Sequence, residues 1–244
     1  MLTEIWAHRG ASAHRAENTM EAFELAVQQG ADGLELDVHL SADGRVIVTH
    51  DENTSRVTGQ DHLVKTLNWA EIQQLNFAWF RHTGETARAP LLEEVLDLIK
   101  RESVKLNIEL KNSKERYFGL EEKALACVRQ FGLEERIVFS SFNHASLTQL
   151  KNLGTTAEIA LLYAMPLLRP CHYAKSRGAG ALHPYYRNLY LPGYLKSCQR
   201  AGLKVRPWTV NEENDLLALM KKGCDGLITN DPAAALRVRQ TLLN

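Results

Sequence analysis

Short apolar segments alternate with longer amphipathic segments through most of the 244-residue chain. Eight of the short segments are rich in valine, isoleucine, leucine and aromatic residues, as buried strands are. In most of the intervening stretches, apolar residues recur at helical spacing, and several of these stretches end in glycine, which is typical of the end of a helix. The predicted strands are residues 5–9, 33–38, 105–110, 136–141, 158–163, 180–185, 205–210 and 226–230.

The predicted helices fill most of the spaces between these strands. Alternation of strands with helices indicates parallel βαβ units. Eight strands in 244 residues match the size of a (β/α)8 barrel. We therefore expect one α/β domain over residues 1–244, folded as a TIM barrel. The predicted helices are residues 18–30, 90–102, 120–132, 143–154, 191–202, 211–223 and 232–243.

Residues 39–89 do not fit this alternation. They contain an additional apolar run at 46–50, followed by a loop-rich stretch with a short helical pattern. The sequence SADG (41–44) precedes the apolar run, and Asp-Gly is a hairpin turn signal. We expect 46–50 to fold back antiparallel on 33–38, so that 39–89 form a small insertion after the second barrel strand. The alternative is that 46–50 is itself a barrel strand and a later strand is misassigned.

Composition and charge narrow the classes of protein that remain. Lysine plus arginine equals aspartate plus glutamate, 29 each, so no basic excess indicates nucleic acid or an anionic membrane as a partner. No apolar run approaches the roughly 20 residues that a membrane helix needs, and the first residues enter a strand-like run without a signal peptide. The four cysteines are scattered, which favours a reducing cytoplasm over a disulfide framework or a zinc site.

Carboxylates recur at the C-terminal ends of the predicted strands, where the active sites of such barrels lie. Glu35 and Asp37 alternate with leucine and valine in LELDVHL (34–40), and Glu109 occupies an equivalent position in the next barrel strand. A solvated strand face would explain the first two residues. If all three face the barrel interior, they repel one another, and one Mg²⁺ or Ca²⁺ ion would offset their charge. Pairing with basic side chains is an alternative that is compatible with metal binding.

Two histidines are expected near these carboxylates. If the hairpin turn centres near Asp43, residue 50 lies opposite residue 36, which brings His50 beside the carboxylate strand. His8 ends the first predicted strand and would reach the same rim. Either histidine alone is more often structural, but two that converge on a carboxylate cluster are better interpreted as an acid–base pair.

Charged neighbours extend this hypothesis. Arg9 and Lys111 would suit a phosphate oxygen because both are cationic and lie next to the predicted cluster. Asp51 would either orient His50 or cap the following turn.

The same residues, in this order, resemble the glycerophosphodiester phosphodiesterase family. Each motif is weak alone, but the ordered set is specific and extends over the whole chain. The motifs are HRG (8–10), ENT (17–19), GADGLELDV (30–38), HD (50–51), IELK (108–111), SF (141–142), WTVN (208–211) and DGLITNDP (225–232).

The resemblance implies a (β/α)8 barrel with a small inserted domain. It also implies metal-dependent hydrolysis of a small-molecule glycerophosphodiester to glycerol 3-phosphate and an alcohol. The implied roles are metal binding for Glu35, Asp37 and Glu109, acid–base catalysis for His8 and His50, phosphate binding for Arg9 and Lys111, and lining of the glycerol side for Phe142 and Trp208. Asn18 would orient groups around His8 or start a helix.

Three departures from the family pattern leave the substrate preference less defined than the reaction class. Ala16, Leu92 and Asn230 stand where the family often has proline, threonine and aspartate. The alternative activities are a lysophospholipase D-type or phospholipase C-like reaction on lipids, which would need an apolar pocket mouth. A non-catalytic metal- or phosphate-binding barrel would lack at least one of the histidines or carboxylates. The sequence leaves the oligomeric state open, a homodimer included.

Overall fold

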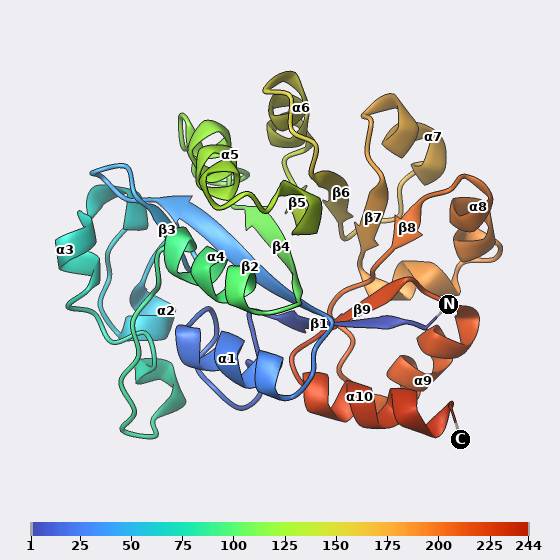
Figure 1. The fold of residues 1–244 in the computed structure, drawn as a ribbon, viewed down its shortest axis with the longest axis horizontal. Coiled ribbons are helices and arrows are strands. Elements are labelled where there is room, and N and C mark those ends of the chain that lie inside the picture. Colours follow the sequence, from blue (N-terminus) through green and yellow to red (C-terminus); the bar gives the residue numbers. More distant parts are fainter. Residues whose placement is uncertain (1, 244) are drawn as a thin grey trace.

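The computed structural model describes residues 2–243 and contains eight parallel strands in a nearly closed barrel, with helices on its outside (Figure 1). The strand order around the barrel is β8-β7-β6-β5-β4-β2-β1-β9. The predicted TIM barrel is therefore confirmed. The barrel strands are β1 (Glu4–His8), β2 (Gly33–Leu40), β4 (Lys105–Leu110), β5 (Ile137–Ser141), β6 (Glu158–Tyr163), β7 (Ala181–Pro184), β8 (Lys204–Val205) and β9 (Gly226–Thr229).

The barrel closes irregularly between β8 and β9. Residues 205–210 were expected to form one strand, but only the first of them belongs to β8. Pro207 has no amide hydrogen, so the regular ladder cannot continue through it. Single backbone hydrogen bonds join the two edges instead, from Asp225 N to Val205 O (3.2 Å) and from Ile228 N to Pro207 O (3.0 Å).

The helices follow the predicted order, with one addition. α7 was not predicted, because it has only seven residues and a single fully buried side chain, Ala174, and so shows no periodic apolar pattern. The outer helices are α1 (Met20–Gln28), α4 (Leu92–Arg101), α5 (Leu120–Phe131), α6 (His144–Asn152), α7 (Pro170–Ser176), α8 (Tyr194–Arg200), α9 (Glu213–Lys222) and α10 (Pro232–Thr241), with short 3-10 turns η3 (Glu134–Arg136) and η4 (Tyr186–Tyr190).

Two apolar layers hold the barrel together. Leu36, Ile108 and their neighbours point outward and pack under the helices in one continuous core. The opposite set of the alternation points inward, where Trp6, Val138 and Ile228 fill the barrel floor. Because both faces of each strand are buried, the polar inward residues near the C-terminal ends must be satisfied by one another or by a ligand.

The expected hairpin is present. β3 (Val46–Val48) pairs antiparallel with β2 and lies outside the barrel order. Its register pairs Val38 with Val48 and Leu40 with Val46, which continues to the predicted match of residue 50 with residue 36. Gly44 adopts φ of 77° in the turn, a left-handed conformation that suits glycine.

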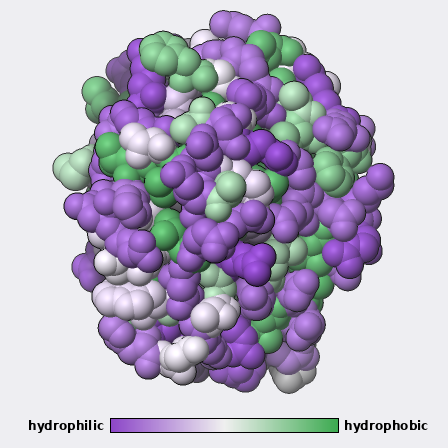
Figure 2. All heavy atoms as spheres, turned by 90° about the vertical axis from the view of Figure 1, so that its left-hand side faces the viewer, coloured by the Kyte–Doolittle hydropathy of each residue, from purple (hydrophilic) through white to green (hydrophobic). Residues whose placement is uncertain are grey.

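The rest of the insertion packs around its own small core. Figure 2 views the molecule from the side of this insertion and shows mainly hydrophilic side chains, with hydrophobic ones as separate patches. No helix within residues 2–243 is long and apolar enough to cross a membrane. The insertion contains α2 (Ser55–Thr58), η1 (Val64–Thr66), α3 (Trp69–Ile72) and η2 (Trp79–Arg81), and its core residues are Ile47, Val57, Val64, Ile72, Leu75, Phe77, Ala89 and Leu91.

Candidate active site

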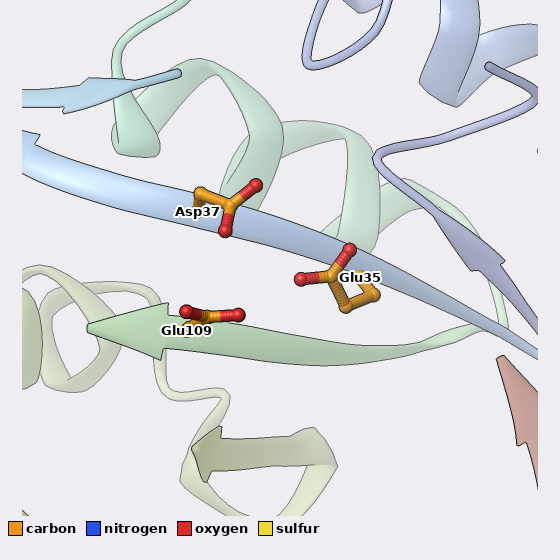
Figure 3. A group of neighbouring side chains, drawn as sticks. All are labelled: Glu35, Asp37 and Glu109. Atoms are coloured by element: carbon orange, nitrogen blue, oxygen red, sulfur yellow. The ribbon is translucent and has the colours of Figure 1, made fainter. Parts of the chain in front are cut away.

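Three buried carboxylates converge inside the barrel mouth. Glu35 and Asp37 point inward from β2, and Glu109 points inward from β4, where its Cα is the register partner of Asp37. One carboxylate oxygen from each lies within 4.8 Å of the other two. Figure 3 shows the three groups facing a common space between the strands. The solvated-face explanation of LELDVHL is therefore wrong, since both of its acids are at most 3% exposed.

Two basic side chains form ion pairs with these three carboxylates, so the negative charges outnumber the positive ones. Arg9 Nε lies 3.4 Å from Asp37 Oδ2, and Lys111 Nζ lies 3.6 Å from Asp37 Oδ1 and 3.0 Å from Glu109 Oε1. Arg9 is shared further, with Glu17 Oε1 at 2.9 Å. Among residues 2–243, the Glu35 carboxylate accepts one hydrogen bond, from the backbone N–H of Arg9 at 2.9 Å. Ion pairing is thus present, but it leaves the carboxylates in excess.

Burial and the charges of this cluster shift the pKa values of the three carboxyl groups. Burial, with the charges of Asp37 and Glu109, raises the pKa of Glu35 well above its ordinary value. Burial also raises the pKa of Glu109, against the opposing effect of Lys111. For Asp37, the charge of Lys111 and other neighbours outweighs burial and lowers the pKa. A divalent cation would relieve this repulsion, and an all-oxygen donor set suits hard ions such as Mg²⁺ or Ca²⁺.

His8 is held by a neutral amide. Its Nδ1 lies 2.6 Å from Asn230 Oδ1. A carboxamide oxygen only accepts, so Nδ1 carries the hydrogen and Nε2 keeps its lone pair. Burial and the charge of Arg9 lower the pKa of His8 to about 4, which keeps the ring neutral at ordinary pH.

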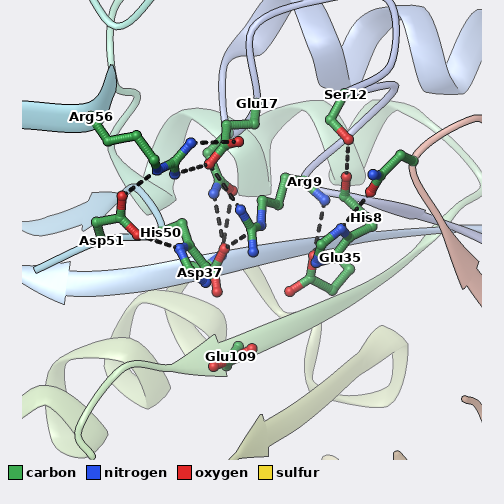
Figure 4. A network of polar contacts seen from close by, with 12 residues as sticks. His8, Arg9, Ser12, Glu17, Glu35, Asp37, His50, Asp51, Arg56 and Glu109 are labelled. Carbon is green, nitrogen blue, oxygen red and sulfur yellow. Dashed lines mark hydrogen bonds and ion pairs between the residues drawn. The ribbon is translucent and has the colours of Figure 1, made fainter. Parts of the chain in front are cut away.

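His50 is held by a carboxylate. Its Nδ1 donates to Asp51 Oδ1 at 2.6 Å, and Asp51 Oδ2 accepts from Arg56 Nε at 2.5 Å (Figure 4). Arg56 also donates to Glu17, which joins the insertion to the segment that follows β1. From behind, His39 Nε2 donates to the backbone carbonyl of His50 at 3.1 Å. The two histidines therefore have different partners, one neutral and one anionic.

One cavity collects most of the predicted site. Phe142 and Trp208 form an edge-to-face aromatic pair at its side, with ring centroids 5.5 Å apart. Trp208 Nε1 donates to the carbonyl of His183 at 2.8 Å, which fixes the indole ring. The lining residues are His8, Arg9, Glu35, His50, Asn107, Glu109, Lys111, Phe142, Leu162, Trp208 and Ile228.

Asn18 lies behind this cavity and contacts Asp37. Its Nδ2 donates to Asp37 Oδ2 at 2.9 Å, and its Oδ1 accepts from the Asp37 backbone at 3.4 Å. The helix-start position belongs to Thr19, whose side chain accepts from Ala22 N. Asn18 and Arg9 both adopt φ of 57°, an unusual conformation outside glycine that here supports the carboxylate strand.

Several supporting residues have no signal in the sequence that assigns them to the site. Asn230 departs from the family pattern, and nothing local predicts its contact with His8. Arg56 lies in the insertion, where sequence spacing predicts no contact with Glu17. Asn107 lines the cavity with a buried Oδ1 that has no hydrogen-bond partner among the described residues. Only the inward alternation of β4 could have indicated it.

Together, the barrel and its mouth bring two histidines beside a buried carboxylate cluster that could hold a cation. A model described as the glycerophosphoryl diester phosphodiesterase family matches residues 8–234. The chain belongs to this family and is a phosphodiesterase by its membership.

Relatives of known name agree with this assignment. The chain is 40% identical to a glycerophosphodiester phosphodiesterase of Caldanaerobacter subterraneus subsp. tengcongensis, over 100% of this chain and 98% of that protein. It is 39% identical to one of Bacillus altitudinis, over 99% and 100%. Among solved structures, it resembles an Oleispira antarctica phosphodiesterase in complex with the product sn-glycerol-3-phosphate, with TM-score 0.87, 28% identity, and coverage of 98% and 97%.

Proposed function

We propose that the cavity binds a glycerophosphodiester and hydrolyses it to glycerol 3-phosphate and an alcohol, with the help of one divalent cation. The observation that carries this proposal is one cavity lined by two histidines, two basic side chains and two carboxylates, with an Asp37 oxygen within 4.8 Å of both carboxylates. The product seen in the Oleispira antarctica relative supports the same substrate class.

Binding would depend on charge. Arg9 and Lys111 pair with the carboxylates and also line the cavity, so N–H groups not used in these pairs would hold phosphate oxygens. Glu35, Asp37 and Glu109 would hold the cation, which when bound supplies positive charge that stabilises the phosphorane-like transition state. Phe142 and Trp208 would contact the carbon skeleton of the glycerol.

The unlike partners of the histidines suggest an order of proton transfer. The neutral His8 ring offers Nε2 as the base for the attacking hydroxyl. His50, whose ring is oriented by the hydrogen bond from its Nδ1 to Asp51, would act as the acid that donates to the departing alcohol oxygen. The attacking group is either the glycerol hydroxyl of the substrate, which gives a cyclic phosphate for water to open, or water itself.

A coupled assay of glycerol 3-phosphate release tests the proposal. It should be run on glycerophosphocholine, glycerophosphoethanolamine and glycerophosphoglycerol, with Mg²⁺ and Ca²⁺ in parallel. EDTA should abolish release, and one of the cations should restore it. His8→Ala and His50→Ala should each lower kcat by about 10²–10⁴-fold. Unchanged turnover in either variant would remove that histidine from the mechanism.

A second candidate activity, on lysophospholipids, is favoured by one observation. Large apolar side chains project from the loops around the cavity mouth: Phe118 after β4 is 85% exposed, and Met165 and Leu168 after β6 are 77% and 91% exposed. Exposed apolar groups beside a pocket are typical of lipid contact sites. Phe142 and Leu162 add apolar lining to the cavity itself.

This activity can be separated from the first by its substrate. Phe118→Ser together with Leu168→Ser should lower turnover of lysophosphatidylglycerol and leave turnover of glycerophosphoglycerol unchanged. Leu243→Ser, at an exposed apolar position beyond the last helix, serves as the matched control. Absence of any turnover of the lysolipid by the wild type would exclude this candidate.

We further propose that residues 1–244 act as a single catalytic domain, with 39–89 as an insertion that supplies His50 and Arg56. All four cysteines are free thiols, which fits the reducing cytoplasm. Light scattering of the purified protein would determine whether it is a monomer or a homodimer.

A further inference from the structure

Two cysteines far apart in the sequence meet on the outside of the barrel. Cys171 lies on α7 and Cys198 on α8, and their Sγ atoms are 3.6 Å apart. Cys198 is fully buried, whereas Cys171 is partly accessible. We propose that these residues form a reversible intramolecular disulfide when a low-molecular-weight disulfide acts as the oxidant. This modification site is independent of the proposed activity.

The geometry requires little movement. A disulfide bond is about 2.0 Å long, so the two sulfurs need to approach by about 1.6 Å from their present 3.6 Å. α7 and α8 already pack against each other, and each has only seven residues. Rotation of the two side chains, with a slight adjustment of α7, can bring the sulfurs into bonding distance.

The reaction is a pair of thiol–disulfide exchanges. The Cys171 thiolate attacks one sulfur of oxidised glutathione, forms a mixed disulfide and releases one glutathione thiolate. The Cys198 thiolate then attacks the Cys171 sulfur, forms the protein disulfide and releases the second glutathione. The two protons lost by the cysteines are taken up by the two glutathione thiolates, so the protein is oxidised by two electrons and the glutathione disulfide is reduced.

The surroundings predict a slow reaction. Burial and the neighbouring Cys171 sulfur raise the pKa of Cys198 to about 12. The charge of Asp225 adds to this shift, and the hydrogen bond from Tyr194 opposes it only in part. The pair is therefore suited to a stabilising crosslink that forms under sustained oxidation, and not to a rapid redox sensor.

The crosslink would lie next to the part of the barrel where the sheet closes irregularly. The loop that it closes contains β7 and η4, and α8 leads directly into β8, the two-residue strand beside the irregular closure of the barrel. Tyr185, inside this loop, packs against Trp208 of the cavity at 5.9 Å between ring centroids. A covalent link between α7 and α8 would restrain local opening at this weak edge.

The test is incubation of the folded protein with oxidised glutathione, followed by alkylation, digestion and mass spectrometry. We expect a peptide that links Cys171 to Cys198, lighter by two hydrogens than the separate thiol peptides. The thiol count after denaturation should fall from four to two, since two of the four cysteines are consumed. The thermal midpoint should rise on oxidation and return with dithiothreitol. Cys127→Ser, on α5, is the matched control and should still form the link.

Two variants separate the steps of the reaction. Cys198→Ala is expected to stop at a glutathione adduct on Cys171, and Cys171→Ser is expected to form no adduct on α8 while the protein stays folded. If the wild type also stops at the mixed disulfide, or links Cys171 to another chain, the two helices cannot adopt the required geometry. The same conclusion follows if the linked peptide forms only in denaturant.

Discussion

At the scale of single residues, side chains of the same type in the site have hydrogen-bond or ion-pair partners of different charge. Both histidines are fixed through Nδ1 at 2.6 Å, but His8 meets a carboxamide and His50 a carboxylate. All three acids are buried, yet among the described residues Asp37 forms ion pairs with Arg9 and Lys111, whereas Glu35 forms no ion pair. Sequence analysis predicted which residue types converge, but these differences depend on contacts that no local pattern encodes.

Asn230 is expected to act by positioning His8. Asn230→Ala removes the acceptor for Nδ1–H, so the ring can rotate, and kcat should fall about 10–100-fold, as is typical when a supporting hydrogen bond is lost. Asn230→Asp keeps an acceptor at the same place and should retain most of the activity. Steady-state kinetics should show the effect on kcat with little change in KM. Equal losses in both variants would contradict a positioning role.

The Glu35 carboxylate is expected to lower the stability of the metal-free protein while being required for activity. Replacement by glutamine keeps an oxygen for the Arg9 N–H but removes a charge that Asp37 and Glu109 repel. In EDTA at pH 7, Glu35→Gln should be about 1 kcal/mol more stable, or roughly 2–4 °C higher in Tm. Added Mg²⁺ or Ca²⁺ should raise the Tm of the wild type only, and the variant should be inactive.

The pH dependence provides the control for this comparison. The folded-state pKa of Glu35 is raised, so its carboxyl costs stability as pH rises above its ordinary value of 4.5. The advantage of the glutamine variant should therefore shrink as pH falls toward 4.5. An advantage that is constant with pH would show that packing, and not charge, separates the two proteins.

At the scale of elements, the hairpin brings His50 to the cavity that His8 also lines, and the proposed catalytic pair depends on it. β3 contributes only three residues to the sheet, yet its register with β2 determines where His50 lies along the carboxylate strand. The pairing continues past β3, since Thr49 N donates to the carbonyl of Asp37 at 3.1 Å. The Asp-Gly signal predicted this turn correctly, because the left-handed residue that it needs is locally specified. The sequence did not indicate α7, since its helical conformation depends on packing of very few residues.

Gly44 tests this dependence. Gly44→Val forces a branched side chain into φ of 77°, which should cost about 1–2 kcal/mol of folding free energy. Because the same turn delivers His50, kcat should also fall at temperatures where the variant is folded. Denaturant unfolding and steady-state kinetics would measure both effects. Gly180→Ala, at an ordinary φ with its new Cβ 3.5 Å from Glu158, is the matched control and should change neither.

At the scale of the whole molecule, polar groups lie on both sides of an apolar layer inside the barrel. Trp6, Val138 and Ile228 belong to the apolar layer, and the carboxylates and histidines of the cavity lie at the C-terminal mouth. On the other side, the buried Arg206 pairs with Glu158, the first residue of β6. His183 is fully buried, and Arg206 Nη1 is 3.5 Å from its Nε2. Burial, together with the charge of Arg206, lowers the pKa of His183 well below 6.5.

This buried histidine should make the fold sensitive to acid. Below pH 6.5 His183 is protonated in the unfolded chain but stays neutral in the folded state, so the free energy of unfolding decreases as pH falls. Each pH unit below 6.5 should cost about 1.4 kcal/mol. His183→Gln removes this contribution, so the difference in unfolding free energy between variant and wild type should shift in favour of the variant from pH 7.5 to pH 5.5. An unchanged difference would contradict the assignment.

The sequence by itself determined the barrel and indicated which acids, histidines and basic residues would converge, because alternation and strand–helix periodicity are local and each places side chains on a known face. Tertiary structure alone decided the irregular closure at Pro207, the meeting of His8 with Asn230, and the approach of Cys171 to Cys198. These contacts join residues from distant parts of the chain, and their distances follow from the packing of the whole barrel, which no short segment specifies.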